Sequence, residues 1–323
     1  MAGIFEIGDI KAGRGSLAKG ELVLCRLNDG SAVGSPLLVA NGAQDGPAVW
    51  LGSAVHGIEL GGSEVIRRLL REEIDPKRLR GTVIGAPIMN PLAFRASDRL
   101  TNYDRNDMNR MFGEGEPSIS RTMAHNLYKL GISKADYVVD YHSCNPPSID
   151  FTILKHGEDE ATSESLELAK AYGVTITSPR SDSAGTLTGR AVADGKPAVC
   201  VELVFSRRLD APSIRSGVLG TKNILVKLGM IEGEVVPQKD TAVIPGEHWY
   251  QAVYCSASGI VTLLKGVGEK VAQGEMFAIV RDAYGQTLEE ICSPVDGYVI
   301  AYPMQGNQAL ASGDKLAYIA WPK

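Results

Sequence analysis

The chain has 323 residues, of which 44% are hydrophobic and 22% charged, and its formal net charge is -5. This length suits one large α/β domain plus a smaller one, and the composition leaves no room for a long disordered segment. The acidic balance, without any Lys/Arg block, argues against nucleic acid or an anionic membrane as partner. Neither a signal peptide nor a membrane-spanning run is evident, so we expect a cytoplasmic protein that acts on small solutes. Its oligomeric state is left open, a homo-oligomer included.

Continuous apolar runs predict four strands that are buried on both faces, at residues 48–55, 82–89, 137–141 and 198–205. Helical periodicity lies between them, at residues 64–74, 118–130 and 160–172. Alternating strands and helices favour a three-layer α/β/α arrangement around a mixed, largely parallel sheet. Such sheets bind ligands outside the carboxyl ends of their strands.

Four residues of chemically active types follow these predicted strands, namely His56, Asn90, His142 and Glu202. Because parallel strands end at the same edge of a sheet, we expect the four side chains to converge there. The sequence therefore predicts one site at this edge.

Near residue 245 the sequence pattern changes to short β-rich segments with frequent glycine. Residues 256–261 resemble residues 293–299, and each copy precedes a second Gly-rich turn. We therefore divide the chain into a catalytic domain, residues 1–244, and a β-rich domain, residues 245–323. The second resembles the barrel-sandwich hybrid of biotinyl and lipoyl carriers, but the hairpin at residues 283–287 has no lysine for a cofactor. Tyr284, Tyr298 and Tyr302 are candidates for a tyrosine that reaches the site from this domain.

His56 and Glu59 are three residues apart where a strand runs into a helix, so both side chains can reach one point. Alone this pair is a weak signal, because a catalytic zinc usually has three protein ligands and an open position. His142, at the end of an apolar strand, supplies a third ligand. Asp140 is our candidate for the carboxylate that accepts the second ring N–H of this histidine.

Five motifs together make the resemblance to a known family specific. In chain order they are His56-Gly57-Ile58-Glu59, Asn90-Pro91, Asp107-Met108-Asn109-Arg110-Met111-Phe112, Asp140-Tyr141-His142-Ser143 and Val201-Glu202-Leu203. This series resembles the succinylglutamate desuccinylase/aspartoacylase family, which is related to the zinc carboxypeptidases. The resemblance covers about residues 45–210 by motif and the rest by domain order.

The resemblance implies a zinc-carboxypeptidase-like fold with one Zn²⁺ per chain, bound by His56, Glu59 and His142. It also implies that Glu202 is the general acid/base. This residue would take a proton from the attacking water and pass it to the leaving nitrogen, since an amide anion is too poor a leaving group.

The same resemblance assigns two contacts with the substrate. Asn109 and Arg110 match a pair that holds a carboxylate, for which a guanidinium can donate two parallel hydrogen bonds. Arg99 lies at the interval from Asp107 at which relatives carry the arginine that polarises the scissile carbonyl, and Arg95 and Arg105 are its rivals. Arg190, in a Gly-rich stretch, is a further candidate for the second polar end of the substrate.

We therefore predict a zinc-dependent amidohydrolase that acts on a small anionic amide such as an N-acyl amino acid. One alternative is a zinc carboxypeptidase that acts on short peptides. Another, from a different class, is a non-catalytic carrier or binding protein, against which the missing hairpin lysine and the intact zinc ligands argue. The acyl group and the amino acid cannot be read from the residues.

Overall fold

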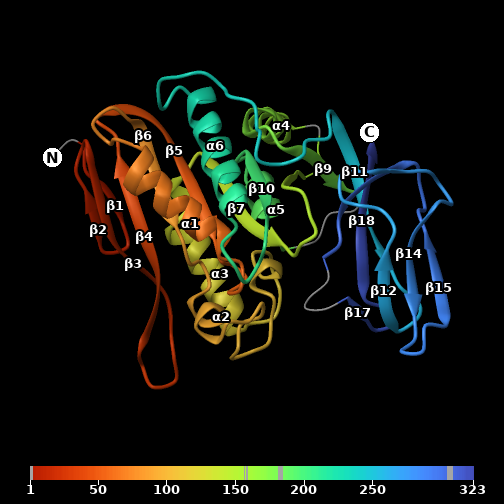
Figure 1. Cartoon of the computed structure of the whole chain (residues 1–323). Helices are drawn as coiled ribbons and strands as arrows, with labels where there is room; N and C mark the ends of the chain where they lie inside the picture. Colours follow the sequence, from red (N-terminus) through yellow and green to blue (C-terminus); the bar gives the residue numbers. More distant parts are fainter. Residues whose placement is uncertain (1–2, 156, 158, 181–184, 304–307) are drawn as a thin grey trace.

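The computed structural model describes residues 3–155, 157, 159–180, 185–303 and 308–323. A small β-hairpin, β1 (Phe5–Ile7) and β2 (Ile10–Ala12), precedes a twelve-stranded sheet (Figure 1). The strands of that sheet are β3 (Ser16–Arg26), β4 (Ala32–Asn41), β5 (Gln44–Ser53), β6 (Arg80–Ala86), β7 (Tyr137–Cys144), β8 (Phe151–Ile153), β9 (Thr175–Pro179), β10 (Ala198–Val204), β11 (Glu247–Tyr254), β13 (Lys270–Val271), β16 (Gly297–Ala301) and β18 (Lys315–Pro322). Their spatial order is β13-β16-β18-β11-β9-β8-β10-β7-β5-β6-β4-β3.

The centre of the sheet carries the four strands expected from the apolar runs. Strands β6, β5, β7 and β10 run parallel to one another, while β8 is antiparallel to β10 and β4 is antiparallel to β6. Both faces of the central strands are buried. The prediction of a mixed, largely parallel sheet in the α/β part of the chain is confirmed.

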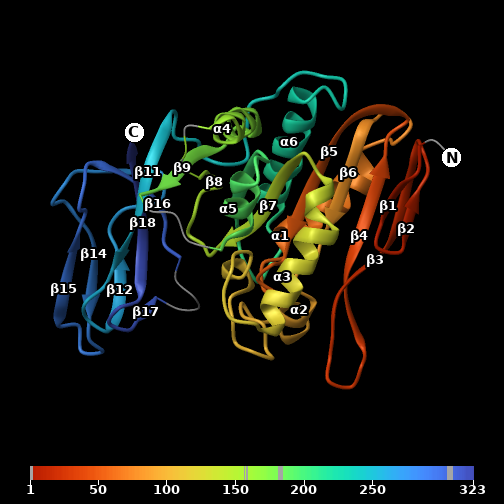
Figure 2. The same cartoon turned by 180° about the vertical axis from the view of Figure 1, so that it is seen from behind.

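Helices cover the two faces of this centre. They are α1 (Gly61–Arg68), α2 (Pro91–Ala96), α3 (Ile119–Leu130), α4 (Glu160–Tyr172), α5 (Leu187–Ala193) and α6 (Ala211–Lys227). Along β5, Val49 and Leu51 pack into the core beneath α1, α4 and α6, whereas Trp50 packs into the core that includes α3 and α5. Figure 1 has α1 and α6 in front of the sheet, and Figure 2, from behind, has α3 in front. The predicted three-layer arrangement is therefore confirmed.

Local sequence signals set the ends of the predicted helices. The side chain of Ser118 accepts a hydrogen bond from the backbone N–H of Arg121 at 3.1 Å and so begins α3. Gly173 ends α4 with φ of 89°, a conformation that glycine adopts without a steric penalty. The helix predicted at residues 64–74 begins earlier, at Gly61, and its last turn, Leu69–Glu73, is π-helical.

The C-terminal strands surround a core of their own. A four-stranded antiparallel sheet contains β15 (Thr287–Cys292), β14 (Met276–Arg281), β12 (Gly259–Leu263) and β17 (Ala309–Leu310) in that order. The two sequence copies exchange short strands, since β13 of the first pairs with β16 of the second and β17 of the second pairs with β12 of the first. The core between the sheets includes Phe277, Tyr302 and Leu316. This arrangement confirms the expected all-β, barrel-sandwich-like unit.

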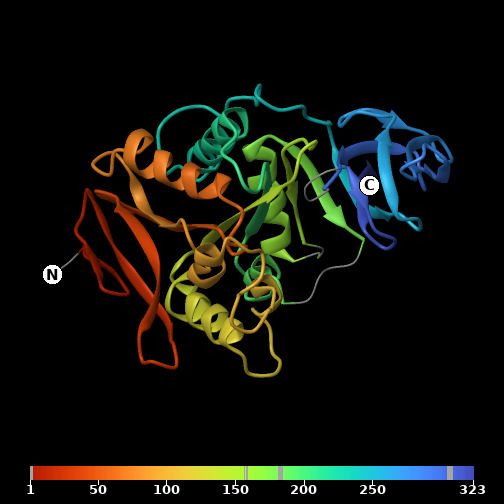
Figure 3. The same cartoon turned by 60° about the horizontal axis from the view of Figure 1, so that its bottom comes forward.

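The twelve-stranded sheet joins the α/β part of the chain to the C-terminal strands through the parallel pair β9 and β11. Figure 3 shows the C-terminal strands at one end of the molecule and the N-terminal strands at the other. The domain boundary at residue 245 stays a prediction. No helix in the described ranges combines the length and apolar character needed to cross a membrane.

Candidate active site

His56 and Glu59 lie in the turn between β5 and α1, and two contacts fix this turn. A Cβ on Gly57 would lie 2.1 Å from the carbonyl carbon of Ala93, so only glycine fits there. Asn90 donates its amide N–H to the carbonyl of the residue before His56 at 3.2 Å, and its side-chain oxygen accepts from the N–H of Ala93 at 3.1 Å. Asn90 therefore positions the turn and caps α2, and it does not line the cavity described below.

His142 and Glu202 lie opposite each other on neighbouring parallel strands, β7 and β10. Their side chains therefore share a face of the sheet. Asp140, two residues before His142 on the same strand, shares that face as well. The expectation that these residues meet at one edge of the sheet is confirmed for His56, His142 and Glu202, which line one cavity.

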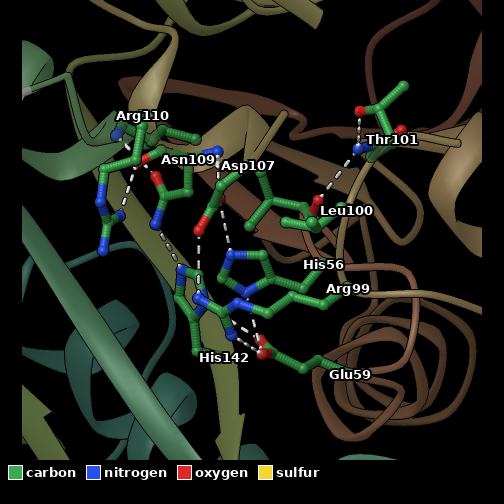
Figure 4. Close-up of polar contacts among 12 residues, drawn as sticks. His56, Glu59, Arg99, Leu100, Thr101, Asp107, Asn109, Arg110 and His142 are labelled. Atoms are coloured by element: carbon green, nitrogen blue, oxygen red, sulfur yellow. Dashed lines mark hydrogen bonds and ion pairs between the residues drawn. The ribbon is translucent and has the colours of Figure 1, made fainter. Parts of the chain in front are cut away.

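The side chains of His56, Glu59 and His142 turn toward one another (Figure 4). Glu59 lies between the two rings, with Oε1 2.8 Å from Nδ1 of His56 and Oε2 3.0 Å from Nδ1 of His142. One ligand atom from each of the three buried residues lies within 4.8 Å of the others. Ligands about 2.0–2.1 Å from a tetrahedral metal lie roughly 3.3 Å apart. The donor set and its spacing therefore fit a metal ion.

In both His56 and His142, the ring nitrogen that points away from Glu59, Nε2, faces a carboxylate. Nε2 of His56 is 2.9 Å from Oδ1 of Asp107, and Nε2 of His142 is 3.0 Å from Oδ2 of Asp140. A neutral imidazole that donates Nε2–H to such a carboxylate keeps its Nδ1 lone pair for a metal. Both rings are thus oriented with Nδ1 toward Glu59, as a metal site requires.

Two arginines and an amide complete this part of the site. Arg99 donates to Glu59 and to Asp107, both at 3.2 Å. The side-chain oxygen of Asn109 accepts the N–H of Leu187 at 2.9 Å, which turns its amide nitrogen toward the site. Arg110, the next residue, is exposed and lines the cavity.

Burial and charge act in opposite directions on the two glutamates. Burial alone would raise the pKa of Glu59, but the facing imidazoles of His56 and His142 hold it well below its usual range. For Glu202 burial raises the pKa, and the negative charge of Glu59 adds to this, although His142 opposes it. Glu59 is therefore the permanent anion, and Glu202 is the glutamate more able to hold a proton.

These residues line a cavity of about 630 Å³ that has two walls. The catalytic wall comes from the turn after β5 and from β7, β10 and the segment around Asn109. The C-terminal wall includes Tyr250 on β11 and Lys315 and Tyr318 on β18. The C-terminal strands therefore help to enclose the site, which is a suitable size for a small ligand.

Several predicted site residues lie elsewhere. Arg190 is on α5, where it pairs with Asp194 at 2.9 Å, lies over the ring of Tyr128 and lines a separate cleft. Its contact with substrate stays a prediction. Arg95 and Arg105 do not line the cavity, in contrast to Arg99.

Tyr284, Tyr298 and Tyr302 are not in the cavity wall either. Tyr284 is 96% exposed at its hairpin, and the hydroxyl of Tyr302 donates to the carbonyl of Lys265. The tyrosines that line the cavity are Tyr250 and Tyr318, which the sequence did not single out.

The fold and the cluster define a class, an α/β protein with a His/Glu set of metal-ligand type at the carboxyl edge of its sheet. The sequence profile of the succinylglutamate desuccinylase/aspartoacylase catalytic domain matches residues 45–228, more than half of the chain. The chain therefore belongs to the succinylglutamate desuccinylase/aspartoacylase family, and the prediction made from the motifs is confirmed.

Relatives resemble the chain over almost its whole length. The N-alpha-acetyl-L-2,4-diaminobutyric acid deacetylase of Halomonas elongata is 28% identical over 307 residues, 91% of this chain and 88% of the relative. The product-bound ectoine utilization protein EutE (DoeB) of Ruegeria pomeroyi is 25% identical with a TM-score of 0.85, covering 98% of each chain. A succinylglutamate desuccinylase/aspartoacylase of Rhodobacter sphaeroides is 26% identical with a TM-score of 0.85, covering 98% of this chain and 99% of that one. The shared fold thus includes the C-terminal strands.

Proposed function

We infer that the protein is a zinc-dependent deacylase, which hydrolyses the amide bond of a small N-acyl amino acid. The observation that carries this proposal is the buried His56, Glu59 and His142 cluster, with a carboxylate behind each ring. The family and the deacetylase named among its relatives support it. These three residues would hold the zinc. When bound, the metal supplies a Lewis acid that lowers the pKa of water and so provides a nucleophile at neutral pH.

Glu202 has the role of general acid/base in this proposal. Its raised pKa suits a group that accepts a proton from the attacking water and then gives it to the leaving nitrogen. Glu202 lies opposite His142 on the neighbouring strand and lines the same cavity, which places its carboxylate on the side of the sheet where the reaction would occur.

Arg110, Asn109 and Arg99 would hold and polarise the substrate. Nε2–H of His142 donates to Asp140, so it cannot also accept from Asn109, and the amide N–H groups of Asn109 stay available for a substrate carboxylate. Arg110 provides the charge for the same carboxylate. Arg99, beside Glu59, would donate to the oxygen on which negative charge develops.

The size of the cavity favours a small amide over a peptide. Its volume is about 630 Å³, and residues of the C-terminal strands help to enclose it. We also propose that residues 245–323 act as a separate domain whose contribution to the reaction is this wall.

Primary-amine release tests the proposal. We would offer N-acetyl, N-formyl and N-succinyl amino acids, with di- and tripeptides beside them, to zinc-loaded and chelator-stripped protein. Zinc-dependent release from an N-acyl amino acid is the expected result. Amine release from the peptides alone would favour the carboxypeptidase. No amine release from either set of compounds, with zinc bound, would contradict the proposal.

A further inference from the structure

Arg190 lines a cleft of about 830 Å³ to which the proposed reaction gives no task. We call it the Arg190 cleft. It lies between α3, the loop at residues 111–117 and Arg190 of α5, and it shares no lining residue with the active-site cavity. Residues of α3 that recur at helical spacing line one side of it, namely Arg121, Thr122, His125, Tyr128 and Lys129.

The buried part of this lining is apolar. Phe112 is 5% exposed and Tyr128 is 8% exposed, and the half-buried Met111 adjoins them. The guanidinium of Arg190 lies over the ring of Tyr128, with Cζ 5.2 Å from the ring centroid. An apolar lining with a cation held at its edge suits a ligand that has an apolar body and an anionic end.

Positive charge exceeds negative charge around the Arg190 cleft. Three cations line it, Arg121, Lys129 and Arg190, together with one acid, Glu114. A second acid, Asp194, pairs with Nε of Arg190 at 2.9 Å. Three cations against two carboxylates leave one positive charge, which matches a monoanion better than a phosphate dianion.

The three cations differ in how far the protein already uses their N–H groups. Arg121 donates to the backbone carbonyls of residues 111, 113 and 116, so it clamps the loop. Arg190 uses one of the five guanidinium N–H groups for Asp194. Lys129 is exposed and forms no ion pair within the described ranges. Arg190 and Lys129 therefore have donors for a carboxylate.

The segments that line the Arg190 cleft also hold the predicted substrate-binding pair of the active site. The side-chain oxygen of Asn109 accepts the N–H of Leu187 in the first turn of α5, the helix that carries Arg190. Just before this helix, a Cβ on Gly185 would lie 2.3 Å from the carbonyl oxygen of Arg110. A ligand that shifts α5 would therefore also shift Asn109 and Arg110.

We propose that the Arg190 cleft binds a small monocarboxylate with an apolar body, and that this ligand changes the affinity of the active site for substrate. The carboxylate lies between Arg190 and Lys129, and the apolar body lies on Phe112 and Tyr128. Binding in the cleft does not require the proposed deacylase function, whereas the effect on substrate rests on it.

Calorimetry with zinc-loaded protein and hydrocinnamate tests the site. We expect saturable binding of this phenyl-bearing carboxylate. Hydrocinnamamide lacks the charge and propionate lacks the ring, so each should bind about tenfold more weakly or worse. Arg190→Met should weaken hydrocinnamate by about tenfold or more, because it removes a charge-assisted hydrogen bond.

Three further variants separate this site from a loss of structure and from the active site. Lys129→Met removes an exposed side chain and should also weaken hydrocinnamate. Lys134→Met is the matched control, since Lys134 is exposed just beyond α3 and outside the cleft, and it should bind like the wild type. Arg110→Met changes the active-site cavity alone and should leave hydrocinnamate binding unchanged.

Amine release at a series of substrate concentrations tests the effect on the active site. With saturating hydrocinnamate we expect the KM of the wild type to change by about fivefold or more, the usual size of coupling between two sites. Lys129→Met should match the wild type without hydrocinnamate and should need a higher hydrocinnamate concentration for the same change in KM. A competitor in the active site would show no such dependence on Lys129.

Absence of saturable hydrocinnamate binding, or binding weakened by Arg110→Met but not by Arg190→Met and Lys129→Met, would overturn the site. A smaller mass for Arg190→Met than for the wild type in sedimentation would overturn it too, because a second copy of the chain would then cover the cleft. A KM that hydrocinnamate leaves unchanged would overturn the effect on substrate. Failure of the wild-type protein to release amine would overturn the proposed function instead, because the calorimetry does not depend on turnover.

Discussion

The two walls of the cavity differ in how their polar groups are satisfied. In the catalytic wall each residue of the His56, Glu59 and His142 cluster has at least two polar contacts within the protein. In the C-terminal wall the ammonium of Lys315 donates one hydrogen bond, to the hydroxyl of Tyr318, and lies over the ring of the same residue. A dense hydrogen-bond network fixes the geometry of its side chains, whereas N–H donors that the protein does not use are available to a ligand. The first wall is suited to chemistry and the second to selection.

Removing one of the proposed zinc ligands from the catalytic wall should have the largest effect on amine release. We expect His142→Ala to lose the bound zinc and to release amine at the rate of chelator-stripped protein, because two ligands remain where three are needed. Zinc content by mass spectrometry and the amine assay check this. Full zinc content in His142→Ala would remove this residue from the ligand set.

Glu202→Gln should separate chemistry from metal binding in the same wall. We expect kcat to fall by about 10²–10⁴-fold while one zinc per chain is retained, since a general base contributes about that factor. Steady-state kinetics on zinc-loaded protein give the answer. A kcat close to that of the wild type would exclude Glu202 from proton transfer.

Asp107→Asn tests how far the wall depends on groups behind the ligands. Asparagine keeps an oxygen for Nε2–H of His56 but removes the charge, and we expect zinc affinity to fall by about 10–100-fold. Competition with a chelator measures this change. The partner variant Asp140→Asn should act in the same direction through His142, and unchanged affinity in both would contradict the role of these carboxylates.

The smallest effect concerns stability and belongs to neither wall. Asp150 is buried, accepts from the hydroxyl of Ser213 at 2.6 Å, and burial raises its pKa to about 6. Because the folded pKa lies above the unfolded one, this group stabilises the fold below about pH 4, and the contribution is lost as pH rises through 6.

Asp150→Asn removes this pH dependence. We expect it to be more stable than the wild type by about 1–2 kcal/mol at pH 7.5, with a difference that shrinks toward pH 4.5. Denaturant unfolding at both pH values checks this. A pH-independent difference would mean that Asp150 does not change its protonation state in this range.

The two walls also differ in how well the sequence predicts them. The catalytic wall follows from local signals, because His56, His142 and Glu202 each stand at the end of an apolar strand. Asp107 was missed as the partner of His56 although it lies within a quoted motif, since the contact joins segments 51 residues apart. The order of the motifs indicates which residues form the site, but it does not show which ring nitrogen of His56 or His142 each carboxylate contacts.

The C-terminal wall could not be predicted from the residues. Lys315 faces the cavity because of a bulge in β18, and Tyr250 and Tyr318 reach it because β11 extends the catalytic sheet from β9. Both features depend on strand pairing between distant segments, which leaves no pattern in the local sequence. Tyr284, a candidate for a tyrosine that reaches the site, is exposed to solvent and lies outside the cavity wall.

The measurement that tests the central claim most directly is amine release as a function of zinc content. Stripped protein is titrated with zinc, and the rate with the best N-acyl amino acid of the panel is followed at each step. We predict that the rate rises in proportion to bound zinc and stops at one zinc per chain. A rate that is already maximal in stripped protein, or that ignores the first equivalent of zinc, would contradict the account.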